Sequence, residues 1–399
     1  MMAEFLLEKA DNIKPWASCW YGVNYSMGIG SRFLIGTILN LITGGKVTAG
    51  KAYFFCEVCL ILIIAIAALM MNNLIKKGTD EKEKYGIIFL ILCFISSPGS
   101  LAAMWTEGNM GRMETYTFLV ILFGVLAFRW FSKTIWKYGI LLFLSIICAA
   151  IYQGYLFLYY PVFCAVMLCD LMDGEKQQKE KLFWTILNLM GAITSFLFFQ
   201  FGTSVHFSNA AEMTAQIQSS TDLNVKKEAV YYEFFAPLSE AFRELNIPFL
   251  TGEEHPIAKT GLLCILLLPI IGIISTVFVK CLKKKPRLTK PYFYCLIINL
   301  AVLPQFVLNV DWGRWMAAVE MVLFFEIFYM YYVGFVEIKQ TIGELGCFVQ
   351  RYMPICIFCV LYLNLFDKFG DRVYFTQLES LWDKIAAFFV SMRVIGALK

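Results

Sequence analysis

Long uncharged runs dominate this chain, and short polar segments separate them. About ten of the runs approach the length of roughly 20 apolar residues that a membrane-spanning helix needs. They lie near residues 52–75, 85–103, 115–128, 138–152, 156–172, 183–202, 259–280, 291–310, 315–335 and 352–366. The pattern predicts an all-α fold, a polytopic integral membrane bundle of about ten or eleven transmembrane helices. We expect one domain over residues 1–399.

The first apolar segment, residues 28–42, is short and carries Arg32 near its start. Two interpretations stay open: a short spanning or re-entrant helix, or a further helix that precedes it in a longer chain. A guanidinium group is costly in lipid. Arg32 is therefore expected at the outer membrane boundary or lining a cavity. Residues 1–20 lack the basic start and apolar centre of a signal peptide.

The basic residues of the short loops predict the orientation of the helices. Lysines and arginines gather in the segments 76–84, 129–137, 173–181 and 280–290. The intervening segments 104–114, 203–258 and 311–314 carry few for their length. By the positive-inside rule, the basic loops are cytoplasmic and the others extracytoplasmic. We expect a multi-pass protein of the bacterial cytoplasmic (inner) membrane.

Composition agrees with a membrane protein and excludes other classes. Apolar residues make up 59% of the chain and charged residues 16%, against about 25% in soluble domains. The net charge of +4 gives no basic stripe, which argues against a nucleic-acid partner. Most of the 13 cysteines lie in apolar runs, where a thiol packs as a small hydrophobe. The chain has no phosphate-binding loop, GxSxG or HExxH motif, so no cofactor and no metal is expected.

The segment 203–258 is the one extended polar region, and we expect it to form a large extracytoplasmic loop. Its second half predicts an amphipathic helix, because Tyr232, Phe235, Leu238, Ala241 and Phe242 recur at helical spacing. Such a helix would lie on the membrane and cover a cavity.

The first candidate site is the polar segment from Trp105 to Glu114. Arg112 offers a planar fork that matches phosphate or carboxylate. Glu107 and Glu114 are candidates for a catalytic base or for orienting sugar hydroxyls, and Trp105 for contact with the substrate. The alternative interpretation is a turn between helices with a local arginine–glutamate pair.

The second candidate site surrounds Asp311 and Arg314. These residues are three apart, so in a helical turn they share one face. Trp312 suits stacking against a sugar ring, and equally suits the interfacial aromatic belt. If Arg112 and Arg314 face one outer cavity, together they form a clamp for a pyrophosphate.

Two further segments add candidate ligand contacts. The three glycines around Arg32 in GIGSRFLIG favour a backbone packed closely against other helices. Gln153 and Tyr155 lie in a tight outer turn, where they are candidates for hydrogen bonds to a glycan. Simple interfacial aromatics explain that turn equally well.

The segments GIGSRFLIG (28–36), GNMGRMETY (108–116) and NVDWGRWM (309–316), with the many-helix layout, resemble bacterial polysaccharide polymerases of the Wzy/EpsG-like type. The resemblance implies a role in O-antigen or exopolysaccharide synthesis. It also implies that Arg32, Arg112 and Arg314 hold a polyprenyl-pyrophosphate-linked glycan. The implied partners are this lipid-linked glycan, membrane lipid and other polysaccharide-assembly proteins.

The expected activity is a glycosyltransferase reaction at the extracytoplasmic face, with Asp311, Glu107 or Glu114 as the base. A transporter or flippase of lipid-linked glycans is the main alternative, and a GT-C-like glycosyltransferase, a scaffold and an acyltransferase are others. The helix centres are almost uncharged, with Glu57, Glu320 and Glu326 as the main exceptions. This distribution favours a site on one face over a path through the membrane.

Overall fold

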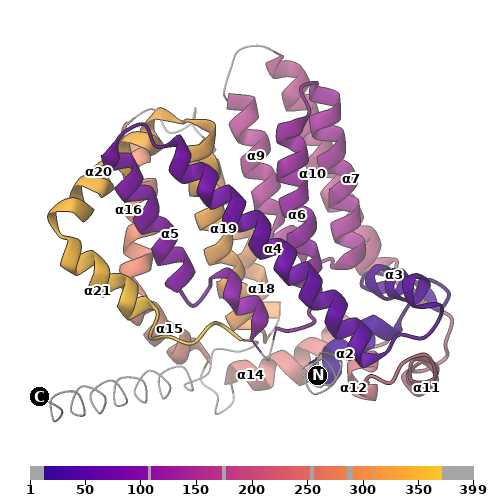
Figure 1. Cartoon of the computed structure of the whole chain (residues 1–399). Helices are drawn as coiled ribbons and strands as arrows, with labels where there is room; N and C mark the ends of the chain where they lie inside the picture. Colours follow the sequence, from indigo (N-terminus) through magenta and orange to yellow (C-terminus); the bar gives the residue numbers. More distant parts are fainter. Residues whose placement is uncertain are drawn as a thin grey trace, which may run out of the picture. The chain divides into compact units, whose positions relative to one another are not determined.

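The computed structural model describes residues 13–106, 109–172, 177–251, 256–284, 291–308 and 310–370, and these residues are largely helical. The helices form two compact units (Figure 1). Unit 1 comprises Met1–Leu69, Glu107–Glu244 and Thr289–Val302. Unit 2 comprises Met70–Thr106, Leu245–Leu288 and Leu303–Lys399. The two units are described in turn.

Six helical segments of the described chain are long and apolar enough to cross a membrane. They are α4 (Ala49–Lys77), α5 with η1 (Glu81–Ser96 and Leu101–Trp105), α6 (Met113–Trp130), α7 (Thr134–Ile151), α10 (Gln178–Phe201) and α19 (Trp312–Val333). Two bent pairs raise the number to eight if each pair is one span: Ile257–Leu266 with Leu268–Lys283, and Val336–Arg351 with Met353–Leu363. The all-α prediction is confirmed.

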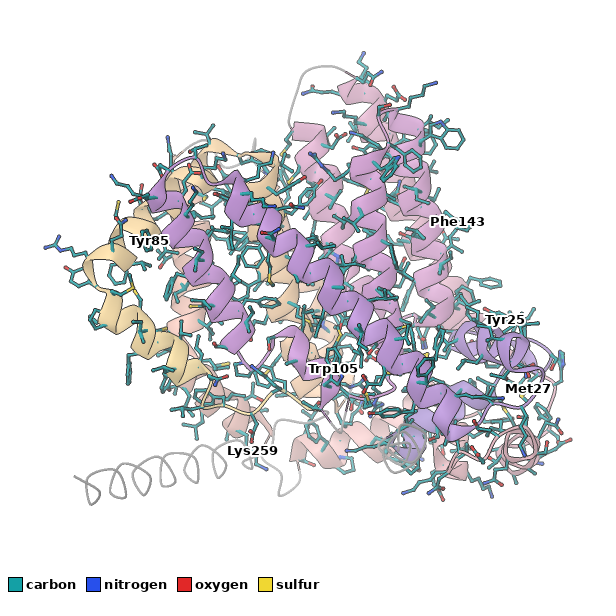
Figure 2. The ribbon with its side chains drawn as sticks, viewed as in Figure 1. Tyr25, Met27, Tyr85, Trp105, Phe143 and Lys259 are labelled. Atoms are coloured by element: carbon teal, nitrogen blue, oxygen red, sulfur yellow. The ribbon has the colours of Figure 1, made fainter. Side chains whose placement is uncertain are left out.

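The long helices expose their apolar side chains and bury polar ones. On α10, Phe183, Ile186 and Met190 are exposed, whereas Asn188 is fully buried and donates to the backbone oxygen of Tyr138 at 3.2 Å. Figure 2 shows Phe143 of α7 on the outside of its helix as well. A soluble protein avoids such large apolar surfaces. Helices of this length with exposed apolar faces are typical of a multi-pass membrane protein.

Within the residues that the structure describes, the six to eight candidate spans are fewer than the ten or eleven predicted. The expected span 156–172 is divided into α8 (Tyr155–Leu158) and α9 (Tyr160–Met172), and 291–310 into α17 (Pro291–Asn299), η4 (Leu300–Val302) and α18 (Leu303–Leu308). The 13 residues of α9 extend only about 20 Å, less than the hydrocarbon thickness of about 30 Å. In each case a proline, Pro161 or Pro304, is the second residue of the helix that follows the break. Proline is tolerated in a first helical turn, where its missing N–H has no partner within the helix, and it cannot continue a helix that began earlier.

Unit 1 is built on a bundle of α6, α7, α9 and α10, which run side by side (Figure 1). At the end of the bundle where α7 and α10 begin, one carboxylate joins three helices. Asp170 of α9 contacts Lys137 of α7 at 3.1 Å and Lys181 of α10 at 3.2 Å. These partly buried ion pairs offset one of the two lysine charges beside the basic loops.

Short elements cover the other end of this bundle. They are α2 (Pro15–Gly22), β1 (Gly28–Ile29), α3 (Phe33–Thr43), β2 (Ser204–Val205), α11 (Ala210–Ser220) and α12 (Lys227–Phe234). Strands β1 and β2 pair antiparallel and fasten the N-terminal region to the segment after α10. Figure 2 labels Tyr25 and Met27 in the connection from α2 to β1, where the Met27 oxygen accepts from the His206 N–H at 3.0 Å.

Residues 28–42 do not form a spanning helix. Helix α3 has 11 residues and extends about 16 Å, half the hydrocarbon thickness. The expectation of close glycine packing is confirmed, because a Cβ atom at Gly36 would lie 1.9 Å from the Val23 oxygen. This short helix lies directly against α2.

The segment expected to form one amphipathic helix is divided. Helix α12 ends at Phe234, and α13 (Leu238–Ala241) begins only after Pro237. Proline cannot continue the hydrogen-bond pattern and disfavours helical backbone before it. The chain then continues through a π-helical turn (Phe242–Asn246) and α14 (Ile247–Thr251).

Unit 2 is organised around the contact between α5 and α20 (Val336–Arg351). Glycines allow the backbones to meet: a Cβ atom at Gly86 would lie 2.1 Å from the Ile342 oxygen, and one at Gly346 would lie 1.8 Å from the Lys82 oxygen. Helices α16 (Leu268–Lys284) and α21 (Met353–Leu363) also contact this pair. Helix α15 (Pro256–Leu266) precedes α16 across the 72° bend.

The chain is interrupted between α5 and η1, at Pro98 and Gly99. Helix α5 ends before it, and the Gly99 N–H donates to Oε2 of Glu320 on α19 at 3.2 Å. A side chain at Gly99 would collide with that carboxylate, since a Cβ atom would lie 2.4 Å from Oε2.

Replacement of Gly346 tests the α5–α20 contact. We expect Gly346→Leu to lower the unfolding free energy in detergent micelles by about 3 kcal/mol, because the added side chain forces two backbones apart. Gly343→Ala on the same helix is the matched control, since its Cβ atom would meet only the Glu83 Cγ at 3.9 Å. Denaturant titration measures both variants, and equal stability would contradict the packing described here.

Candidate functional site

Helix α2 places two tryptophans at the covered end of unit 1. Its sequence PWASCWYG starts with Pro15 in the first helical turn, where a missing N–H costs nothing. The Ser18 hydroxyl donates to the Lys14 oxygen at 3.2 Å. Trp20 is 2% exposed, and Trp16 is half-buried.

Arg32 lies in a sharp corner that brings it to α2. Its φ of 73° is in the left-handed region, which costs a non-glycine residue roughly 1–3 kcal/mol. Hydrogen bonds to the end of α7 hold this conformation: the Arg32 N–H donates to the Ala150 oxygen at 2.9 Å, and the Ser31 hydroxyl donates to the Ala149 oxygen at 2.9 Å. The fold therefore stabilises a strained backbone to fix the position of this arginine.

The Arg32 guanidinium lies in an aromatic and acidic environment. Its Cζ is 5.0 Å from the ring centroid of Trp20 and 5.3 Å from that of Tyr152. It forms an ion pair with Glu233 of α12. The side chain is 15% exposed, so water screens these interactions only in part.

Arg112 approaches the same indole from α6. It precedes the first residue of that helix and is 7% exposed, and its Cζ is 5.4 Å from the Trp20 centroid. The preceding Gly111 has a φ of 80°, and its oxygen accepts a hydrogen bond from the Tyr21 hydroxyl at 2.8 Å. Helix α2 thus holds the turn that places Arg112.

Two arginines that are 80 positions apart therefore meet at Trp20. The neighbouring Cys19 interacts electrostatically with both arginines. Burial raises the pKa of its thiol to about 12, and the positive charges of Arg32 and Arg112 act in the opposite direction. Two largely shielded cations beside one aromatic ring form an environment suited to an anion with several charged oxygens.

Three other predicted residues belong to unit 1. Glu114 lies in the first turn of α6, two positions after Arg112, and is 6% exposed. Gln153 lies beside the Arg32 corner, and its N–H donates to the Ser31 hydroxyl at 3.0 Å. Tyr155 is fully buried, and its ring is 6.0 Å from that of Tyr160.

The remaining predicted residues belong to unit 2, apart from Glu107, which lies outside the described residues. Asp311 directly precedes α19 and forms an ion pair with Arg314 in the first turn of that helix. Trp312 is 8% exposed, with Phe249 and Phe306 at ring distances of 5.8 and 5.6 Å. Trp105, which is labelled in Figure 2, ends η1 and is half-buried.

Sequence reasoning missed Trp16, Trp20 and Glu233. The first two carry a recognisable signal, because PWASCWYG places two tryptophans in a short helix just before the glycine-rich GIGSR segment. Glu233 is a single acid within the aromatic run YYEFF. Its partners Arg32 and Trp16 are distant in the sequence, and the packing of α12 against α2 brings them to Glu233.

The arrangement can bind an anionic group, orient it against an aromatic ring and offer a nearby carboxylate. This chemistry comes from the side chains alone. The chain matches no protein-family model, no curated protein and no solved structure.

Proposed function

We propose that this chain is a glycan polymerase of the bacterial cytoplasmic membrane. It joins polyprenyl-pyrophosphate-linked sugars at the extracytoplasmic face during synthesis of a surface polysaccharide. The observation that carries the proposal is the meeting of Arg32 and Arg112 at Trp20. The resemblance of the three arginine-bearing segments to Wzy/EpsG-like polymerases agrees with it.

The substrate class follows from the charge and shape of the arginine site. Guanidinium groups bind phosphate oxygens through paired N–H donors, and a pyrophosphate offers oxygens to two of them. The apolar faces of the adjacent helices suit the polyprenyl chain. The activated sugar arrives already linked to pyrophosphate, so the reaction needs no nucleotide.

The reaction transfers a glycan from pyrophosphate to a sugar hydroxyl. The bond between the anomeric carbon and the pyrophosphate oxygen breaks, and the leaving pyrophosphate takes the electron pair. Arg32 and Arg112 stabilise the negative charge that develops on it. Glu114 accepts the proton of the attacking hydroxyl, because it is the one acid among the three candidates that the structure describes in the same unit as both arginines.

The orientation of unit 1 supports an extracytoplasmic site. Arg112 precedes α6 at one end of the bundle, and the Lys137–Asp170–Lys181 cluster lies at the other. The basic segments 129–137 and 173–181 contain or adjoin the residues of the lysine cluster. The positive-inside rule assigns these basic segments to the cytoplasm. The arginine site then faces the opposite side of the membrane.

Replacement of the arginines tests the mechanism. We expect Arg32→Ala and Arg112→Ala each to reduce polymer formation by about 100-fold or more. Each substitution removes a positive charge that stabilises the negative charge of the leaving pyrophosphate. The measurement is glycan length on a gel after incubation of purified protein with a polyprenyl-pyrophosphate-linked oligosaccharide. Arg129→Ala, in the last turn of the same helix as Arg112, is the control and should retain activity.

A transporter of lipid-linked glycans is the second candidate, and one observation favours it. Glu320 is buried within the long apolar helix α19 and contacts the helix interruption at Gly99. Buried acids within membrane helices often belong to transport pathways. Broken helices frequently form the substrate and ion sites of transporters.

Glu320→Gln separates the two candidates, since glutamine keeps the hydrogen-bond acceptor and loses the charge. For a polymerase we expect this variant to keep lengthening glycans in detergent, where no membrane separates two compartments. A transporter would move labelled lipid-linked oligosaccharide across vesicles without lengthening it, and Glu320→Gln would stop that movement. Transport without chain growth by the unaltered protein would reject the polymerase.

A further inference from the structure

Glu233 of α12 already fills a ligand position on Arg32. Its Oε2 pairs with the guanidinium, and its Oε1 accepts the indole N–H of Trp16 at 2.8 Å. The carboxylate is 13% exposed, so both oxygens are largely shielded from water. An anion that binds Arg32 from outside must therefore compete with this internal carboxylate.

A diphosphate has an advantage in this competition. Glu233 carries one negative charge and contacts Arg32 and Trp16. A diphosphate carries more charge and more oxygens, so it can engage both guanidinium groups beside Trp20 at once. A singly charged ligand gains no such benefit over Glu233.

The helix that carries Glu233 is held by side chains. Tyr232 stacks on Trp16 with a centroid distance of 6.3 Å, and Phe234 meets Phe33 edge to face at 5.4 Å. Helix α12 has eight residues, too few to be stable in isolation. Its position thus depends on these contacts with α2 and α3 and on its packing against α11, and Pro237 separates it from the next helix.

We infer that α12 is a displaceable lid, and that Glu233 occupies the diphosphate position on Arg32 until a diphosphate ligand displaces it. Binding transfers the guanidinium from the carboxylate to the phosphate, and α12 then loses its ionic attachment. Ligands with one charge leave the lid in place. The inference rests on the proposed function for the identity of its ligand, a diphosphate ester.

Calorimetric titration of the full-length chain in detergent with inorganic pyrophosphate tests the competition. We expect Glu233→Gln to lower the Kd about tenfold, because glutamine keeps an acceptor for Trp16 and removes the competing charge. Glu240→Gln is the matched control, since Glu240 accepts from the Tyr231 hydroxyl at 2.7 Å; its Kd should equal that of the unaltered chain. An unchanged or higher Kd for Glu233→Gln overturns the inference, as does failure of all three proteins to bind pyrophosphate.

Hydrogen exchange tests the movement of the lid. We expect pyrophosphate to speed amide exchange in residues 227–234 of the unaltered chain, and Glu233→Gln to show fast exchange without ligand. If the glutamine variant does not fold, Glu233→Asp replaces it. This variant keeps the charge but shortens the reach to Arg32, so residues 227–234 should again exchange fast without ligand. Slower exchange on addition of pyrophosphate would show closure over the ligand and overturn the inference.

These results are distinguishable from a failure of the proposed function. Tighter pyrophosphate binding by Glu233→Gln, with no polymer from any protein, supports the lid and rejects the polymerase. Polymer formation with no effect of Glu233→Gln on the Kd supports the polymerase and rejects the lid.

Discussion

The covered end of unit 1 depends on two cations, one buried and one half-buried, that share one indole ring. The guanidinium groups of Arg32 and Arg112 each lie within 5.4 Å of the Trp20 centroid, so they are within about one Debye length of each other. Like charges this close repel, and burial strengthens the repulsion. The negative face of the indole and the carboxylate of Glu233 offset part of this energy. A site built in this way is stabilised by anions.

Several features of the fold follow from holding these cations in place. Arg32 adopts a left-handed backbone that the end of α7 stabilises through hydrogen bonds. Arg112 follows a glycine turn that Tyr21 of α2 holds. Helix α2 is only eight residues long, yet six of them are buried. The four-helix bundle supplies a rigid base, and the short elements at its end supply the chemistry.

The long helices could be predicted from sequence because spanning a bilayer imposes length and apolarity together. The predicted segment 52–75 lies within the observed Ala49–Lys77, and the predicted segment 183–202 lies within Gln178–Phe201 except for its last residue. The shorter helices could not be predicted as such. Hydropathy depends on composition and not on helix direction. The break before Pro304 and the 72° bend near Leu267 lie within apolar runs, so hydropathy did not predict them. Pro237 by itself indicates that the amphipathic segment is divided. The helical spacing of the apolar residues on both sides of this proline instead predicted one continuous helix.

By itself the sequence determined the helical class, the apolar faces and the three arginine-bearing segments, because each depends on local composition or spacing. It did not determine which side chains meet. Trp20 and Glu233 became partners of Arg32 only through contacts between elements that are distant in the chain, and no local pattern encodes such a contact. Asp311 and Arg314 differ because they are three residues apart at the start of one helix, so the local geometry of the chain brings them together. Contacts within a helix follow from spacing, whereas contacts between helices follow from packing.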